Sequence, residues 1–255
     1  MGLFESFGVI GAAGAPALAA AETYFDAQPA AMLRAALAGD AARVRDLLGT
    51  GVDPNSHGPR SADKNTPQIT LLGYALGQRN EAALRVLIQA GASPLFEARA
   101  DDGNAFLFAI VRKDSAMLDA LYRAWPIAKI PANSQSRDAF SALGFKCNEC
   151  LQVMFKNGLS VGVQDELGYN LLMEALSRED FKTAEWLLKD VGVPLDAESN
   201  RGITPANQLQ AQIARYKPDT PVLESLLRLK ALMQTRGVAF PVETAEQRRS
   251  SRGIK

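Results

Sequence analysis

The chain has 255 residues, 47% of them hydrophobic, so it can bury a large core as one elongated array or as one or two compact domains. Lysine and arginine together number 28, as do aspartate and glutamate, so no net charge attracts nucleic acid or an anionic membrane. Any electrostatic recognition must therefore be local. The single histidine, His57, lies in a stretch rich in Gly, Pro and Asn, which argues against Ser-His-Asp or Cys-His catalysis.

The first 25 residues are predicted to be either a signal peptide or a hydrophobic cap on the fold that follows. Residues 7–21 are apolar and uncharged, and residues 17–19 and 19–21 both fit the small-x-small pattern of a cleavage site. Glu5 is the only charged side chain in the first 21 residues, so the usual basic region is missing. We expect export to the periplasm, and the alternative is an intact N-terminus on a cytoplasmic protein.

Neither a membrane nor a nucleic acid is an expected partner. Outside the leader, no apolar run reaches the roughly 18 to 20 residues of a spanning helix, so we expect no stable membrane insertion of the mature protein. The first six residues fit the N-myristoylation pattern, but a single acyl chain anchors only marginally. Residues 241–255 are predicted to be a disordered basic tail, with a nucleic-acid arm as the alternative.

One pattern recurs along the chain: apolar, two variable, two apolar, two variable, glycine, apolar. A helix ends well at such a glycine, because the residue after the last turn often adopts a positive φ. Gly91 and Gly158 are 67 residues apart, about twice 33, so we expect one unit between them whose closing glycine is replaced by Pro126. A period near 33 predicts an array of helix pairs that do not fold singly. The closing glycines are Gly51, Gly91, Gly158 and, with one extra residue, Gly192.

Six such units are expected in chain order. The second follows an unusually long loop at 55–68, and the sixth contains an insertion around 216–221. In the second repeat, the apolar stripe expected to pack against neighbouring helices is Leu72, Leu76, Leu84, Leu87 and Ile88. The units are expected at 29–37 with 41–48; 70–75 with 81–89; 102–108 with 115–125; about 137 to 159; 168–175 with 181–189; and 202–206 with 222–237.

The openings of these units resemble ankyrin repeats. Gly202-x-Thr204-Pro205, the trio Thr70, Leu72 and Ala75, and the glycine-closed second helices carry the resemblance. It implies an all-α, ankyrin-like helical-repeat solenoid of about five to six repeats over residues 26–240. No unit keeps the whole Thr-Pro-Leu-His signature, so the hydrogen bonds between neighbouring turns are in question, although the apolar core is not. A tetratricopeptide array is the alternative, but its Trp, Gly and Tyr positions do not recur.

Cys147 and Cys150 have CxxC spacing in a predicted helix, one turn apart on one face. No second cysteine pair and no nearby histidine complete a tetrahedral metal site, so no metal is expected. Two interpretations remain open: a short disulfide in an oxidising compartment, or two small buried residues.

The resemblance implies a protein partner that contacts the tips of the turns and the exposed side of the first helices. Tyr169, Arg112 and Lys113 stand out, because tyrosine and arginine dominate interface hot spots. The long loop is a further candidate. The predicted contacts are Arg99, Asp101, Asp102, Asn104, Asp165, Glu166 and Tyr169 at the tips; Gln78, Arg79, Arg112, Lys113 and Arg178 at helix ends; and Arg60, Asp63 and Lys64 in the loop.

The sequence is also similar to bacterial ankyrin proteins of the kind that serve as immunity proteins in interbacterial toxin systems. That resemblance implies an exported protein that binds and neutralises a secreted toxin or effector, with no cofactor and no catalytic residue. A cytoplasmic ankyrin scaffold or regulator is the alternative. An enzyme using the carboxylate pairs Asp101-Asp102 or Asp165-Glu166 is a more distant one, since adjacent acidic residues on a turn normally point apart.

Overall fold

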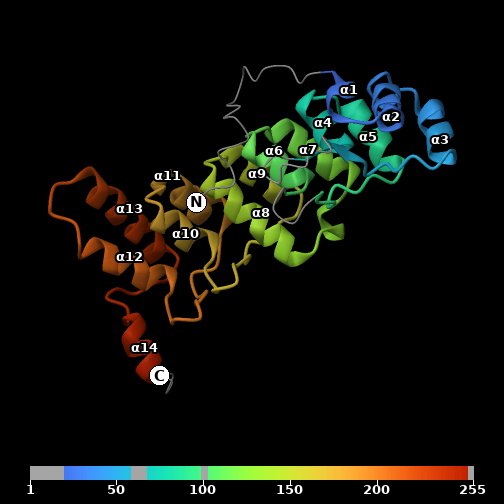
Figure 1. Ribbon diagram of the computed structural model, residues 1–255. Helices are drawn as coiled ribbons and strands as arrows, with labels where there is room; N and C mark the ends of the chain where they lie inside the picture. The colour runs from blue at the N-terminus through green and yellow to red at the C-terminus, as the bar shows by residue number, and fades with distance from the viewer. Residues whose placement is uncertain (1–19, 59–67, 99–102, 252–255) are drawn as a thin grey trace. The chain divides into compact units, whose positions relative to one another are not determined.

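The computed structural model describes residues 20–58, 68–98 and 103–251, and these residues form a succession of helices (Figure 1). The predicted leader lies mostly outside the described residues. Within them, no helix is long and apolar enough to cross a membrane. The chain divides into two compact units: a first unit, Met1–Pro131 with Gln152–Asn157, and a second unit, Ala132–Leu151 with Gly158–Lys255.

The first unit contains three pairs of antiparallel helices, each a first helix followed by a second. A two-stranded antiparallel ladder, in which His57 pairs with Thr70, brackets the long loop between the first two pairs. The elements are α1 (Ala21–Tyr24), α2 (Ala27–Leu37), α3 (Ala41–Gly49), β1 (His57–Gly58), β2 (Ile69–Thr70), α4 (Leu71–Gly77), α5 (Glu81–Gln89), α6 (Ala105–Val111), α7 (Ser115–Ala124) and the 3₁₀ turn η1 (Ile127–Lys129).

The second unit continues the same alternation. Its second helices include a π-helical turn, η2, and α9 contributes its last residues, 152–156, to the first unit. The elements are α8 (Ala132–Gly144), α9 (Asn148–Lys156), α10 (Leu171–Ser177), α11 (Phe181–Trp186), η2 (Leu187–Val191), α12 (Pro205–Ile213), α13 (Pro221–Thr235) and α14 (Ala245–Ser251).

The predicted apolar stripe forms the core of the α4–α5 pair. Leu72 and Leu76 on α4, and Leu84 and Leu87 on α5, are all buried, whereas Ile88 is half-buried. Helix α4 also packs on α6, and α5 packs on α7, so each pair covers the apolar face of the next. Each fully buried leucine contributes about 1.5–3 kcal/mol relative to an exposed one, and a single pair could not bury its own stripe.

The helix-closing glycines have the left-handed backbone expected from the sequence: φ is 90° at Gly51, 99° at Gly91 and 101° at Gly158. At Gly91 the chain then turns back, because the next residue donates its N–H to the carbonyl of Leu87 at 3.0 Å. Where the sequence has Pro126 instead, α7 ends in an extended residue, Trp125, with φ of −139°. The glycine template therefore predicts where the second helices end.

The extra residue before Gly192 is absorbed in η2. Gly91 follows the cap of its helix, Asn80, by 11 residues, whereas Gly192 follows Asp180 by 12. In the longer repeat Val193 donates its N–H to the carbonyl of Leu187 at 3.2 Å, as Ala92 does to Leu87. The same closing hydrogen bond therefore forms, and the additional residue widens the last turn into a π-turn.

Side-chain caps begin both helices of most pairs. At the second helices, Asp40, Asn80, Asp114 and Asp180 each accept a hydrogen bond from the N–H three residues later. At four first helices the acceptor is Thr70, Asn104, Asn170 or Thr204. Each cap stabilises its helix by about 1 kcal/mol.

The missing histidine of the ankyrin signature does not prevent links between neighbouring repeats. Asn207 stands at the histidine position of the last repeat and completes a capping box with Thr204. Asn170 donates its side-chain N–H to the carbonyl of Pro194 at 2.9 Å, and Asn80 donates to the carbonyl of Leu37 at 3.2 Å. Asparagine side chains thus connect successive turns in both units.

Helix α8 departs from the expected pattern. The sequence predicts that the fourth repeat starts near Arg137, but α8 begins at Ala132. It has 13 residues, whereas α4, α6 and α10 have 7 each. Pro126 and Pro131 leave only the short η1 between α7 and α8. No turn rich in Gly, Asn or Asp precedes this unit, so the residues of the usual turn become the first turns of a longer helix.

Within the first unit, charged side chains connect α5, α7 and the end of α9. Arg123 on α7 pairs with Glu81 on α5 at 3.0 Å, and Lys156 at the end of α9 pairs with Asp119 on α7 at 3.2 Å. Burial raises the pKa of Asp119, but hydrogen bonds from Asn157 and Lys156 and the charges of Lys156 and Arg123 outweigh that effect and leave the pKa lowered. The carboxylate is therefore held in its charged form.

The C-terminal segment differs from its expectation. Residues 241–255 are predicted to be disordered, but Ala245–Ser251 form α14. A capping box begins this helix: Thr244 accepts from the N–H of Gln247 at 3.2 Å, and the Gln247 carboxamide accepts from the N–H of Thr244 at 2.8 Å. The sequence contains the capping-box pattern Thr-x-x-Gln at 244–247, which predicts the start of a helix. The prediction of disorder was instead based on the basic composition of the tail.

Candidate protein-binding surface

Two successive turns of the second unit have the same construction, 34 residues apart. In the first turn, the Asp165 carboxylate accepts hydrogen bonds from the N–H groups of Leu167 and Tyr169 at 2.9 and 2.8 Å. In the second, the Ser199 hydroxyl accepts from Arg201 and Ile203 at 3.3 and 3.1 Å. A short polar side chain therefore folds each turn on itself.

The two turns are also joined to each other. Asn200 donates its backbone N–H to the carbonyl of Leu167 at 2.8 Å and its side-chain N–H to the carbonyl of Glu166 at 3.2 Å. Gly168, with φ of 80°, makes this approach possible, because a Cβ there would lie 3.0 Å from the carbonyl oxygen of Glu198 and from the Cα of Ser199. The turns thus form one edge, residues 165–170 and 199–204, which we call the turn edge.

Leu167 is the most exposed large apolar side chain among the described residues, at 57%, and it lies at the tip of the turn edge. Val161, 45% exposed, lies in the same connection between α9 and α10. Leu167 was not among the predicted contacts, which were all polar or aromatic residues. Its signal was an apolar residue set between Glu166 and Gly168 in a turn, where nothing local can bury it.

The three predicted residues of this edge have different environments. Asp165 is half-buried, and its carboxylate oxygen is engaged by backbone donors, so it shapes the turn. Glu166 is exposed, and Tyr169 is half-buried. Asp165 and Glu166 therefore do not act as a matched pair of free carboxylates.

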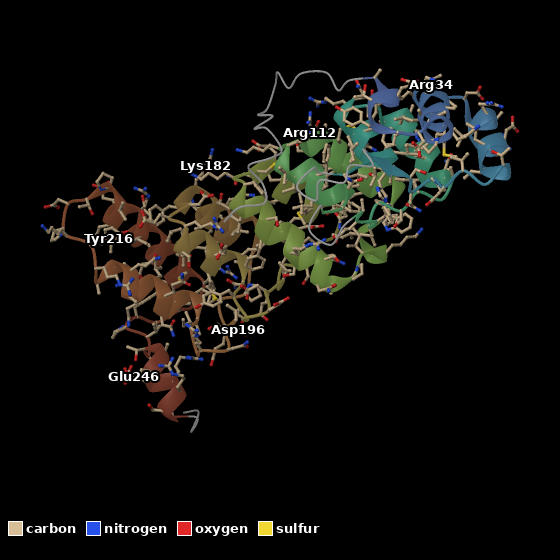
Figure 2. The ribbon with its side chains drawn as sticks, viewed as in Figure 1. Arg34, Arg112, Lys182, Asp196, Tyr216 and Glu246 are labelled. Atoms are coloured by element: carbon tan, nitrogen blue, oxygen red, sulfur yellow. A yellow bond between two sulfur atoms is a disulfide. The ribbon has the colours of Figure 1, made fainter. Side chains whose placement is uncertain are left out.

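In the first unit, the predicted helix-end residues Gln78, Arg79, Arg112 and Lys113 lie where α4 and α6 end. Gln78 and Arg112 are the C-cap residues of the two helices. Arg79 pairs with Asp114 at 3.2 Å. Arg112, which is labelled in Figure 2, has its guanidinium 5.5 Å from the centre of the Phe108 ring.

Arg79 and Lys113 share an uncommon backbone conformation, with φ of 53° and 54°. Gly39 occupies the equivalent place after α2, with φ of 75°. A residue with a Cβ adopts this left-handed conformation at a cost of roughly 1 kcal/mol or more. The turn between first and second helix therefore presents long charged side chains on a strained backbone in two successive repeats of the first unit.

The remaining predicted residues divide into three groups. Asn104 is buried and caps α6, accepting hydrogen bonds from two backbone N–H groups, so little of it can reach a partner. Arg178, at the end of α10, is exposed and pairs with Glu174. Those outside the described residues are Arg60, Asp63, Lys64, Arg99, Asp101 and Asp102.

Cys147 and Cys150 form a disulfide at the start of α9, and both are fully buried. Cys147 stands where α3, α5, α7 and α11 have their Asp or Asn cap, and its sulfur accepts a hydrogen bond from the N–H of Cys150 at 3.3 Å. Of the two interpretations left open by the sequence, the structure contains the disulfide. It links the cap residue covalently to the residue that the other caps reach by a hydrogen bond.

His57 contacts a neighbouring side chain. Its Nδ1 lies 3.1 Å from the Gln68 side-chain oxygen, and its ring stacks on Phe96 with centroids 6.1 Å apart. Within the described ranges, no three His, Cys, Asp or Glu side chains gather in a group that could hold a metal ion. His57 thus helps to close the base of the long loop.

Comparisons with known proteins agree with this geometry. Residues 139–188, which contain the disulfide and the first turn of the turn edge, match the family described as ankyrin repeats (many copies). No curated protein matches the sequence.

Among solved structures, the ankyrin repeat domain of Bcl-3, described as a unique member of the IkappaB protein family, is similar with a TM-score of 0.62 and 19% identity, over 88% of this chain and 96% of that one. The human ASB11 ankyrin repeat domain is similar with a TM-score of 0.39 and 16% identity, over 78% and 96% of the two chains. The chain has an all-α, ankyrin-like repeat fold, and residues 139–188 carry the sequence pattern of ankyrin repeats.

Proposed function

We propose that this chain is a protein-binding module and that the turn edge is its principal contact surface. Stacked helix pairs offer an extended surface for another macromolecule. The turn edge is held by hydrogen bonds within and between its turns, so little conformational entropy is lost when a partner docks. The observation that carries the proposal is Leu167, which is 57% exposed at the tip of this ordered edge.

We further propose that the partner is a secreted toxin or effector, and that the chain acts as an immunity-type protein outside the reducing cytoplasm. The disulfide of Cys147 and Cys150 supports an oxidising compartment, because thiols of cytosolic proteins are generally kept reduced. The resemblance of the repeats to bacterial ankyrin immunity proteins supports the choice of partner. A cytoplasmic scaffold would be expected to have both thiols reduced.

Site-specific photo-crosslinking in the native cell tests the surface. A photoreactive amino acid at Leu167 should yield one adduct of defined mass, whereas the same group at Lys182, an exposed position on α11, should not. Mass spectrometry of the adduct then identifies the partner, and a secreted toxin or effector is expected. Equal labelling from both positions would remove the basis for assigning binding to the turn edge.

Inhibition and localisation need separate measurements. If the crosslinked protein is a toxin, the wild-type chain should restore the growth of cells that receive it, and Leu167→Asp should not. Native cells should be quenched in acid and alkylated under denaturing conditions, because both cysteines are buried in the fold. Resistance to alkylation before reduction, together with a mature N-terminus near Ala20 or Glu22, is expected for an exported protein. Two alkylated thiols and an intact Met1 would support the cytoplasmic alternative.

A further inference from the structure

The C-terminal segment of the chain lies against the last turn of the second unit. The Gln210 side chain on α12 makes a two-way contact with the backbone of Val242: its N–H donates to the carbonyl at 2.9 Å, and its oxygen accepts from the N–H at 2.8 Å. The side-chain amide of Gln210 thus pairs with both backbone polar groups of Val242, as the backbone of a neighbouring β-strand would. The segment that leads into α14 is thus held against α12.

Two arginines of α14 then reach the second turn of the turn edge and Glu198, the residue just before it. Arg248 pairs with Glu198 at 2.7 Å, and their side chains are only 26% and 19% exposed. Arg249 donates to the backbone carbonyl of Arg201 at 2.7 Å. A carboxylate and a carbonyl, three residues apart in the same turn, therefore receive two adjacent guanidinium groups.

The backbone approach between the two segments is close. A Cβ on Gly202 would lie 3.2 Å from the carbonyl oxygen of Ala245 and 3.2 Å from Cγ of Arg249. Gly202 also has a left-handed backbone, with φ of 74°. The turn at 198–202 is therefore shaped to accept the first turn of a helix at close range.

Helix α14 is nevertheless held almost entirely by polar contacts. None of its seven residues is buried, in contrast to α12 and α13, each of which buries several. Ion pairs that remain partly exposed stabilise a contact only weakly, and salt weakens them further. The chemistry of the docking site is thus specific, but the grip on α14 is weak enough to be exchanged.

We propose that Glu198, the carbonyl of Arg201 and the Gln210 side chain form a docking site for an arginine-bearing helical segment of a protein partner, and that α14 occupies this site in cis. The inference deepens the proposed function, since it names the chemistry that the end of the turn edge recognises. A tether of this length holds α14 at an effective concentration of millimolar order, so a partner segment must displace it to bind.

A labelled peptide of residues 240–255 provides the probe, with fluorescence anisotropy as the measurement. The full-length variant Arg248→Ala/Arg249→Ala should bind it at least about tenfold more tightly than the wild type, because the cis competitor is removed. Arg215→Ala/Arg228→Ala removes two exposed arginines elsewhere in the second unit and is the matched control. It should bind no better than the wild type.

Glu198→Gln, added to the Arg248→Ala/Arg249→Ala variant (the open variant), should lower the affinity for the peptide severalfold, and raising the salt should also weaken binding in the open variant. Gln210→Ala provides a second test if Glu198→Gln alters the circular dichroism spectrum. Equal affinity of wild type and open variant, or binding that ignores both site substitutions, would overturn the proposal. So would a wild type that is dimeric when the open variant is monomeric, because the occupant would then be a second copy. The crosslink at Leu167 does not depend on α14, so it can succeed or fail independently of this experiment.

Discussion

Arg79 adopts the left-handed backbone that Gly39 adopts at the same place in the preceding helix pair, with φ of 53° against 75°. We expect Arg79→Gly to relieve this strain and to raise the free energy of unfolding by up to about 1 kcal/mol, less whatever its exposed ion pair with Asp114 contributes. Urea unfolding followed by circular dichroism measures the change. Lys113→Gly is the companion variant, and its gain should be the larger because Lys113 forms no ion pair with any residue that the structure describes. A loss of stability in both variants would contradict the strain argument.

Two glycines with positive φ should respond differently to a methyl group. At Gly91 an added Cβ would meet only Cγ of Pro54, at 3.7 Å, so Gly91→Ala should cost about 1 kcal/mol, from the backbone conformation alone. At Gly168 the Cβ would lie 3.0 Å from two backbone atoms of the next turn, so Gly168→Ala should cost clearly more and separate the two turns. Thermal and urea denaturation compare the two. Equal losses would mean that the approach of the turns does not depend on Gly168.

Acid should weaken the connection between α7 and α9. Since the pKa of Asp119 is lowered in the folded protein, its contribution to stability is present above the unfolded value of 3.8 and is lost as the pH falls through the folded value. Asp119→Asn should therefore lower stability at pH 7, by about 1 kcal/mol or less, and should reduce the loss of stability on going from pH 5 to pH 3. Urea midpoints of both proteins across this range test the effect. Parallel pH curves would exclude a role for Asp119.

The disulfide should contribute modestly, because it closes a very short loop. Loop-closure entropy for so few residues corresponds to about 2 kcal/mol. If the wild type is unfolded, reduced and then refolded, its free energy of unfolding should therefore fall by about that amount. Cys147→Ser/Cys150→Ala replaces the covalent link by an ordinary serine cap, and it should be about 1 kcal/mol more stable than Cys147→Ala/Cys150→Ala. Chemical denaturation of the three proteins measures both differences. If the serine and alanine variants are equally stable, position 147 does not cap α9.

Much of the fold follows from local patterns. The glycine template predicted where Gly91 and Gly158 end their helices, because a left-handed helix end has few alternatives to glycine. The early start of α8 escaped prediction, since a missing turn leaves no positive signal. The fold of α14 was also missed: its helix has no apolar stripe, and the Thr244 cap gains its significance only when Arg248 meets a carboxylate 50 residues away in the chain.

The candidate site was harder to predict than the fold. Position at a turn tip selected residues such as Asp165 and Asn104, whose side chains accept backbone hydrogen bonds that shape a turn or cap a helix. Whether a polar atom is free to meet a partner depends on the backbone donors around it, and these are known only once the turn is built. Exposure at a turn tip, which marks Leu167, likewise depends on how the next repeat stacks.

The π-turn of η2 separates the length of a repeat from its stacking. Leu187 and Val193 keep the hydrogen bond of the shorter repeats, so the surplus residue is confined to one bulge before Gly192. The following turn still begins at its ordinary distance from the closing glycine, because Gly202 follows Gly192 by 10 residues, as Gly168 follows Gly158. An insertion of one residue at this point therefore leaves the start of the following turn and helix unchanged. We infer that η2 is a position where the chain tolerates the gain or loss of a residue.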